Sequence, residues 1–418
     1  MQPDTDVVII GAGAAGLAAA KELVKRGHTC KVVEGSHRIG GRAYSEEIST
    51  GVWFDLGCAW LVGGAANPFT AIADALGIAI SKDKSDRFVL ENLRFRRDGQ
   101  PLDGEQRAAC LRYYDESYAA ITSAADQGRD VAISDVVDMA NEYAPPLLCG
   151  IASAWGMDID LVSTADFASA TGELGFQAPH GYGNLVAAWG ADVDVSLNAR
   201  AERVDWSGGG VTIATPKGTI TGRVALITVS TGILASGDIR FHPDLPVWKT
   251  EAIYDLPMGT ENKIGVHFDT DVFGAEGRGF FSTWNDDGSA AKVDASVMGF
   301  NAASVFVGGR YGVWLEKQGQ RACQEFATDR IADIFGNDVR RHVDRCIATA
   351  WNTEPWTRGS WACARPGAAH QRANLARPVD ERLFFAGEAT VYGGQGTCHG
   401  AYQSGIRAAH EIAQQLAS

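Results

Sequence analysis

The sequence predicts an α/β fold at the start of the chain, and three features of its first 34 residues carry that prediction. Residues 7–10 (VVII) form an unbroken β-branched run, which is typical of a central parallel strand buried on both faces. A glycine turn at residues 11–16 follows, and residues 17–26 then have the composition of a helix. A second strand at residues 30–33 ends on Glu34. This order of strand, glycine turn, helix and strand predicts a Rossmann-like unit that binds a dinucleotide.

Each position of the glycine turn has a physical role in this arrangement. Gly11 permits the tight turn, Gly13 lets backbone N–H groups approach a pyrophosphate, and Gly16 lets the helix pack closely on the strand. The helix N-terminus near Ala15 faces the phosphates with the positive end of its dipole. Glu34, which comes 18 residues after Gly16, is placed to accept hydrogen bonds from an adenosine ribose.

A basic, glycine-rich loop, residues 35–42 (GSHRIGGR), comes directly after the second strand. Arg42 carries a fork of N–H donors that reaches a pyrophosphate, and Gly40 and Gly41 allow a close approach of the backbone. Gly35 is a further candidate contact in this loop. The glycine turn alone does not separate NAD from FAD. However, the pattern of an acidic residue at the end of the strand followed by this loop resembles the corresponding segment of flavin amine oxidases. NAD dehydrogenases do not usually have this pattern. We therefore expect FAD as the cofactor.

Beyond this loop, the chain resembles the flavin-containing monoamine and polyamine oxidase family as far as its C-terminus. Seven segments match motifs of that family and occur in the family's order. The segments are residues 54–60 (FDLGCAW), 181–185 (GYGNL), 229–234 (VSTGIL), 239–246 (IRFHPDLP), 258–268 (MGTENKIGVHF), 359–367 (GSWACARPG) and 383–405.

The resemblance implies an architecture that is α/β in one part and α+β in the other. A Rossmann-like FAD-binding domain is interleaved with a substrate domain of mixed sheet plus helices. The family's layout assigns residues 1–75, 183–250 and 350–418 to the FAD-binding domain and residues 76–182 and 251–349 to the substrate-binding domain. Within the latter, the apolar spacing between residues 103 and 140 is loosely helical, so we expect a helical cover over the cleft.

The resemblance also assigns further FAD contacts along the isoalloxazine, near the adenine, near the ribityl chain and at the start of the last helix. These residues are Gly57, Cys58, Ala59, Trp60, Val204, Gly387, Glu388, Thr397 and Cys398. Ser360 stands where monoamine oxidases have the cysteine that bonds covalently to FAD. Because a serine cannot form that thioether, we expect noncovalent FAD.

Three residues are the candidates for the chemistry itself: Lys263, Trp361 and Thr397. Lys263 lies in an alternating apolar strand, where a lysine is costly to bury. By resemblance it holds a water against flavin N5 and aids the reaction of reduced flavin with oxygen, whereas the alternative is a lysine that reaches solvent from a strand start. Trp361 and Thr397 occupy the positions of the family's aromatic cage, although Trp361 also suits ordinary core packing.

These residues favour an amine oxidase that takes a hydride from the carbon beside an amine nitrogen and uses O2. Three alternatives stay open: an L-amino-acid oxidase, an FAD-dependent amine dehydrogenase, and a non-catalytic FAD-binding interaction module. An amino-acid oxidase needs an arginine clamp for the carboxylate, and Arg94, Arg96 and Arg97 are its candidates.

The sequence departs from polyamine oxidases at one substrate anchor. Those enzymes tend to have an acidic residue or a histidine just after the tryptophan of the 54–60 segment, and this chain has Leu61 and Val62. The sequence therefore favours a shorter or partly apolar amine over a long polyamine as the substrate. Asp166 and Glu173 are candidate replacement anchors in the substrate-binding domain.

Composition limits the partners. The net charge of −14 argues against nucleic acid, which binds clustered lysine and arginine. No apolar run approaches the roughly 18–20 residues of a membrane span, and no secretory signal precedes residue 7, so we expect a cytoplasmic protein. The eight cysteines lack paired CxxC spacing, which predicts free thiols and no metal site.

Overall fold

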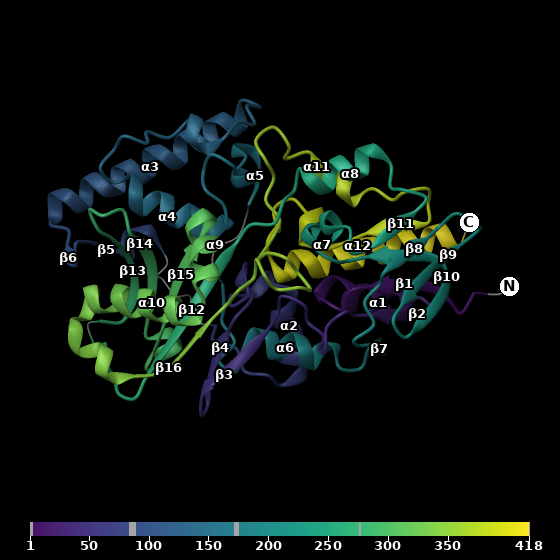
Figure 1. The fold of residues 1–418 in the computed structure, drawn as a ribbon, viewed down its shortest axis with the longest axis horizontal. Helices are drawn as coiled ribbons and strands as arrows, with labels where there is room; N and C mark the ends of the chain where they lie inside the picture. Colours follow the sequence, from purple (N-terminus) through teal and green to yellow (C-terminus); the bar gives the residue numbers. More distant parts are fainter. Residues whose placement is uncertain (1–2, 83–88, 171–174, 276, 418) are drawn as a thin grey trace.

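Two large sheets with helices on their faces make up the molecule (Figure 1). The computed structural model describes residues 3–82, 89–170, 175–275 and 277–417. Within these residues, the first sheet has eight strands, the second has seven, and β3 (Ser45–Ser49) and β4 (Val52–Asp55) form a separate hairpin. Both chain termini lie at the end of the molecule that contains the first sheet (Figure 1).

The first sheet is built around β1, which pairs in parallel with β10 and with β2. Residues 7–10 of β1 are at most 2% exposed, as expected for a strand covered on both faces. The strands of this sheet are β1 (Thr5–Ile10), β2 (Cys30–Val33), β7 (Val195–Ser196), β8 (Arg203–Asp205), β9 (Val211–Thr215), β10 (Gly218–Ile227), β11 (Arg240–His242) and β17 (Leu383–Phe385).

Helix α1 (Ala14–Lys25) follows β1 and begins three residues earlier than the sequence predicts, because the turn itself needs only residues 11–13. Gly16 lies inside the first helical turn, where a Cβ would be 2.0 Å from the carbonyl oxygen of Gly11. Helix α12 (Cys398–Ala417) packs on α1 through Gly405, whose Cβ would be 2.1 Å from the carbonyl oxygen of Ala15. Glycine is therefore required for the close approach at both contacts.

The second sheet runs in the order β16-β12-β15-β14-β13-β5-β6 and is mostly antiparallel. On one face, Ile264, Val266 and Phe268 of β12 belong to the same core as α10. Because side chains alternate along a strand, Lys263 points to the opposite face. The strands are β5 (Arg94–Arg97), β6 (Gln100–Pro101), β12 (Glu261–Phe268), β13 (Gly279–Trp284), β14 (Ala290–Ala295), β15 (Ala302–Gly308) and β16 (Val343–Ala348).

Helix α3 (Gly104–Asp126) and helix α4 (Ala144–Trp155) cover that opposite face (Figure 1). The side chain of Asp103 begins α3 through a reciprocal capping box with Gln106. The predicted helical stretch from 103 to 140 is thus helical to residue 126, and a short 3-10 turn at Ile133–Asp135 follows. The other helices are α2 (Pro68–Leu76), α5 (Thr164–Ser169), α6 (Tyr182–Gly190), α7 (Thr231–Ser236), α8 (Val247–Tyr254), α9 (Gly309–Gln318), α10 (Gln320–Phe335) and α11 (Gln371–Ala376).

The chain crosses between the two sheets several times. Strands of the first sheet come from residues 5–33, 195–242 and 383–385, and strands of the second come from residues 94–101 and 261–348. The hairpin of β3 (Ser45–Ser49) and β4 (Val52–Asp55) approaches the second sheet, where Phe54 packs against Gly265. The predicted combination of an α/β part and a mixed sheet with helices is confirmed, whereas the residue boundaries of the two domains stay a prediction. None of the described helices is long and apolar enough to cross a membrane.

Candidate active site

A cavity of about 1440 Å³ is lined by residues of both sheets. It exceeds the roughly 300–1,000 Å³ of a typical small-ligand pocket, so it has room for a dinucleotide and a substrate together. The three candidates for the chemistry all line it, and so do the predicted FAD contacts except Gly16 and Val204. Gly16 lies beneath Gly11 in the turn, and Val204 is fully buried within β8.

The glycine turn forms one end of this cavity. Gly11 has a φ of +108°, and a Cβ there would lie 2.6 Å from Thr228 Oγ1. At Gly13 a Cβ would meet no atom within 4 Å, so its backbone is open to the cavity. The Glu34 carboxylate accepts hydrogen bonds from the N–H groups of Ala12 and Ser36, each at 2.8 Å. An open glycine backbone beside a fixed carboxylate fits the pyrophosphate and ribose of a dinucleotide.

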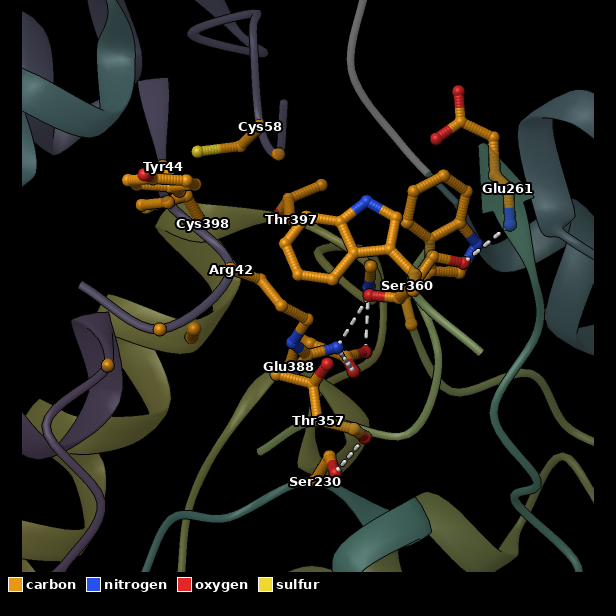
Figure 2. A pocket seen from close by; sticks show the side chains of 18 of the residues that line it. Arg42, Tyr44, Cys58, Ser230, Glu261, Thr357, Ser360, Glu388, Thr397 and Cys398 are labelled. Carbon is orange, nitrogen blue, oxygen red and sulfur yellow. Dashed lines mark hydrogen bonds and ion pairs between the residues drawn. The ribbon is translucent and has the colours of Figure 1, made fainter. Parts of the chain in front are cut away.

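Arg42 is held in the cavity wall by groups from the end of the chain (Figure 2). Its Nη1 donates to Glu388 Oε1 and to the carbonyl oxygen of Ser360, both at 2.8 Å. Glu388 is 4% exposed and also accepts hydrogen bonds from the N–H groups of Ala362 and Gly396. Glu388 therefore holds Arg42 together with the two loop segments that contain Ala362 and Gly396.

Lys263 lies at the junction of the two sheets. Its Nζ donates to the carbonyl oxygens of Gly57 and Asp55 and is 5.1 Å from the centre of the Trp60 ring. At 4% exposed, the side chain does not reach solvent, which argues against the alternative interpretation of Lys263. Burial raises the pKa of the Asp55 carboxyl to about 6, against the opposing effects of a hydrogen bond from Ser45 and the charge of Lys263.

The two predicted cage positions differ in their contacts. A Cβ at Gly396 would be 3.4 Å from Trp361 Cγ, so the indole lies against the loop that leads into α12. Thr397 Oγ1 accepts a hydrogen bond from Gly400 N at 3.0 Å and donates to the carbonyl oxygen of Gly394 at 2.6 Å. The Thr397 hydroxyl thus caps α12, and Trp361 is the aromatic member at this position.

Ser360 has two buried hydrogen bonds. Its hydroxyl accepts one from Glu261 N and donates one to the carbonyl oxygen of Gly259, each at 2.9 Å. Those bonds tie the 359–361 segment to the start of β12 (Figure 2).

Two buried charged residues that line the cavity, Glu261 and Lys292, were not predicted from the sequence. Glu261 is 3% exposed, and burial raises the pKa of its carboxyl to about 7, although the charge of Lys263 opposes this. The sequence could have indicated Glu261, because it lies two residues before Lys263 on the same strand and both side chains therefore share a face. An aromatic lining beyond Lys263 was not predicted either, and it consists of Tyr114, Tyr118, Trp155, Phe167, Phe280 and Phe306.

Several candidate substrate anchors lie elsewhere. None of the three candidate clamp residues, Arg94, Arg96 and Arg97, lines the cavity, because they lie on β5 away from it. Asp166 does not line it either, since its carboxylate forms a fully buried ion pair with Arg372. Its proposed role as an anchor is therefore wrong. Glu173 lies outside the described residues.

Comparison with known proteins decides the family. Residues 14–413 match the family described as flavin containing amine oxidoreductase. The chain belongs to this family. It is a flavin-containing oxidoreductase that acts on amines, with FAD as its cofactor. The resemblance, the cofactor and the class of reaction expected from the sequence are thereby confirmed.

The proteins that this amine oxidoreductase resembles are named for different substrates. Polyamine oxidase 4 of Oryza sativa subsp. japonica is 28% identical over 98% of this chain and 89% of the relative. Lysine-specific histone demethylase 1 homolog 1 of the same organism is also 28% identical, but the match covers 52% of that protein. The structure of cyclohexylamine oxidase from Brevibacterium oxydans IH-35A shares the fold, with a TM-score of 0.83 over 100% of both chains at 20% identity.

Proposed function

We propose that this amine oxidoreductase is an oxidase that removes a hydride from the carbon next to an amine nitrogen. FAD bound in this cavity would supply the acceptor for that hydride, with O2 as the final electron acceptor that gives H2O2, and the imine product would hydrolyse. The observation that supports this most directly is the continuity of the cavity. It runs from the glycine turn at Gly11 and Gly13 to the aromatic lining beyond Lys263.

The residues that would hold FAD come from three separate segments. Gly11, Gly13, Glu34 and Arg42 form the dinucleotide end, where backbone N–H groups and a guanidinium favour phosphate. The segment 57–60 and the N-terminus of α12 bound the region beside Lys263. Ser360 offers no thiol at the position of the linking cysteine, which supports a noncovalent attachment of FAD.

The residues around Lys263 prepare the amine. An amine must be neutral to release a hydride, because the nitrogen lone pair stabilises the positive charge that forms on carbon. Glu261, with a pKa of about 7 and its side chain buried in the cavity wall, accepts the proton of the incoming ammonium. Trp361 and the aromatic lining exclude water and provide π faces for the amine.

The test uses purified yellow holoenzyme and a panel of primary, secondary and α-amino-acid amines. We expect some alkyl amine to bleach the flavin without oxygen and to produce H2O2 in air. Bleaching without peroxide in air would indicate a dehydrogenase with another electron acceptor. A preference for L-α-amino acids would favour the amino-acid oxidase, and no bleaching by any amine would contradict the proposal.

A further inference from the structure

Lys292 is a second buried lysine in the cavity wall, and the proposed function does not use it. It lies on β14, lines the cavity and is 6% exposed. Its cross-strand neighbours are Ser282 on β13 and Phe306 on β15, and Phe306 in turn lies opposite Lys263 on β12. Since adjacent strands are about 4.8 Å apart, the backbone positions of the two lysines are separated by about 10 Å across the sheet.

Neutral groups surround the ammonium of Lys292. Its Nζ donates to Ser282 Oγ at 2.8 Å and to Tyr114 Oη at 3.3 Å. Burial raises the pKa of the Tyr114 phenol well above its usual value, and it also raises the pKa of the nearby Cys149 thiol. Both groups are therefore uncharged at neutral pH and provide no negative charge for Lys292.

No carboxyl group of the described residues forms an ion pair with Lys292. Asp294 is two positions further along β14, but it does not line the cavity. Burial lowers the pKa of Lys292 to about 8, so most molecules still carry the positive charge at pH 7. A buried charge without a counter-charge is unfavourable, and a bound anion would remove much of that cost.

Helix α4 leaves space for this ammonium at Gly150. A Cβ at Gly150 would lie 3.2 Å from Lys292 Nζ and 3.0 Å from Lys292 Cε. The lysine head group therefore occupies the space between α4 and the sheet that a larger residue at position 150 would crowd. The cavity is the side from which a ligand can reach it.

We propose that Lys292 binds an anionic group at the far end of the substrate, and that the substrate is an ω-amino carboxylate. This inference rests on the proposed function, because it takes amine oxidation beside Lys263 as given. In this arrangement the amine end lies near the Glu261 carboxyl and the carboxylate end near the Lys292 ammonium. The ammonium of Lys263 is directed to the carbonyl oxygens of Gly57 and Asp55. The second ammonium of a diamine would instead meet a like charge at Lys292.

The experiment compares 6-aminohexanoate, 1,6-diaminohexane and hexylamine as reductants of the wild-type holoenzyme under anaerobic conditions. We expect reduction by 6-aminohexanoate to be at least about tenfold more efficient than reduction by the diamine, as for one charge-assisted contact. Lys292→Met, which keeps the apolar stem, should remove this preference and leave hexylamine little changed. Lys292→Glu should reverse it in favour of the diamine. Lys317→Met, at an exposed lysine, is the matched control.

Binding of hexanoate provides a readout without turnover. Calorimetry should detect hexanoate binding to the wild-type holoenzyme, weakened by about tenfold or more in Lys292→Met. Equal use of the diamine and the amino carboxylate by the wild type, or an unchanged preference in Lys292→Met, would overturn the inference. If hexylamine reduces the flavin in those cases, the proposed function stands and only the role of Lys292 fails. If no amine reduces the flavin, the proposed function itself fails and the inference fails with it.

Discussion

At the glycine turn, a single carboxylate both holds the backbone and lines the cavity. Glu34 accepts hydrogen bonds from Ala12 N and Ser36 N, each at 2.8 Å. Glu34→Ala removes this acceptor and any bond to the ribose, so we expect FAD binding to weaken by about 1–3 kcal/mol. Fluorescence titration of the apoprotein with FAD measures this change. Glu325→Ala, at an exposed glutamate, is the control and should leave the affinity for FAD unchanged. An unchanged FAD affinity in Glu34→Ala would refute the role of Glu34 in FAD binding.

The ammonium group of Lys263 places a positive charge and hydrogen-bond donors at the junction of the two sheets. Lys263→Met keeps the stem but removes the contacts with the carbonyl oxygens of Gly57 and Asp55. We expect reoxidation of the reduced holoenzyme by O2 to slow by roughly tenfold or more, because negative charge that develops on oxygen loses a preorganised partner. Reduction by a good amine should change less. Stopped-flow absorbance separates the two half-reactions, and a collapse of reduction alone would show a positioning role instead.

Ser360 is the basis of the prediction that FAD is bound noncovalently. Its hydroxyl is occupied by Glu261 N and the carbonyl oxygen of Gly259, and a hydroxyl does not form the thioether of a linking cysteine. Acid precipitation of the holoenzyme should therefore release free FAD into the supernatant. Yellow colour that stays with the precipitated protein would contradict this expectation.

On the scale of one strand, β12 buries the Glu261 carboxyl, and we expect this burial to make the stability of the protein depend on pH. The pKa of Glu261 rises from 4.5 to about 7 on folding because the carboxyl is buried. The folded state thus holds this proton more tightly, and its stabilising effect is present below pH 4.5 and lost as the pH rises to about 7.

Glu261→Gln removes that titration while keeping the size of the side chain. Relative to wild type, the free energy of unfolding of the variant should increase between pH 4.5 and pH 7 by up to about 3 kcal/mol. Thermal unfolding of both proteins at several pH values in this range measures the difference. Parallel pH profiles for the two proteins would show that the Glu261 carboxyl does not titrate in this way.

On the scale of the whole molecule, one buried ion pair joins segments assigned to different domains. Asp166 on α5 and Arg372 on α11 are both fully buried, and Arg372 also donates to the carbonyl oxygens of Ala362 and Ala389. Asp166→Ala leaves the guanidinium without its counter-charge, so we expect a loss of about 3–5 kcal/mol in unfolding free energy.

The matched control for this ion pair is an exposed one of the same type. Arg310 and Asp160 form a two-pronged contact at 2.8 and 2.7 Å, with exposed side chains on both sides. Asp160→Ala should cost less than about 1 kcal/mol, because water screens the pair. Chemical denaturation of both variants with FAD bound provides the comparison. Equal losses for the two variants would contradict a special role of the buried pair.

The sequence by itself determined the parts of the protein that depend on consecutive residues. The buried run at residues 7–10, the glycines after it and the acidic end of β2 predicted a Rossmann-like unit, because their function requires a fixed spacing along the chain. Ordered family motifs extended this prediction to FAD and to amine oxidation. The exact start of α1 was missed, since small residues at its first turn are compatible with both turn and helix.

Only the tertiary structure decided which distant residues share the cavity. Glu388 meets Arg42 across 346 positions of sequence, and Asp166 turns away from the cavity to pair with Arg372. The alignment of Lys263, Phe306 and Lys292 depends on the register of three antiparallel strands, and a shift by one residue would turn a side chain to the other face. Residue composition does not fix that register, because it follows from how the whole sheet packs against α4 and α10. The sequence therefore predicted the cofactor, whereas only the folded structure showed which charged residues line the cavity.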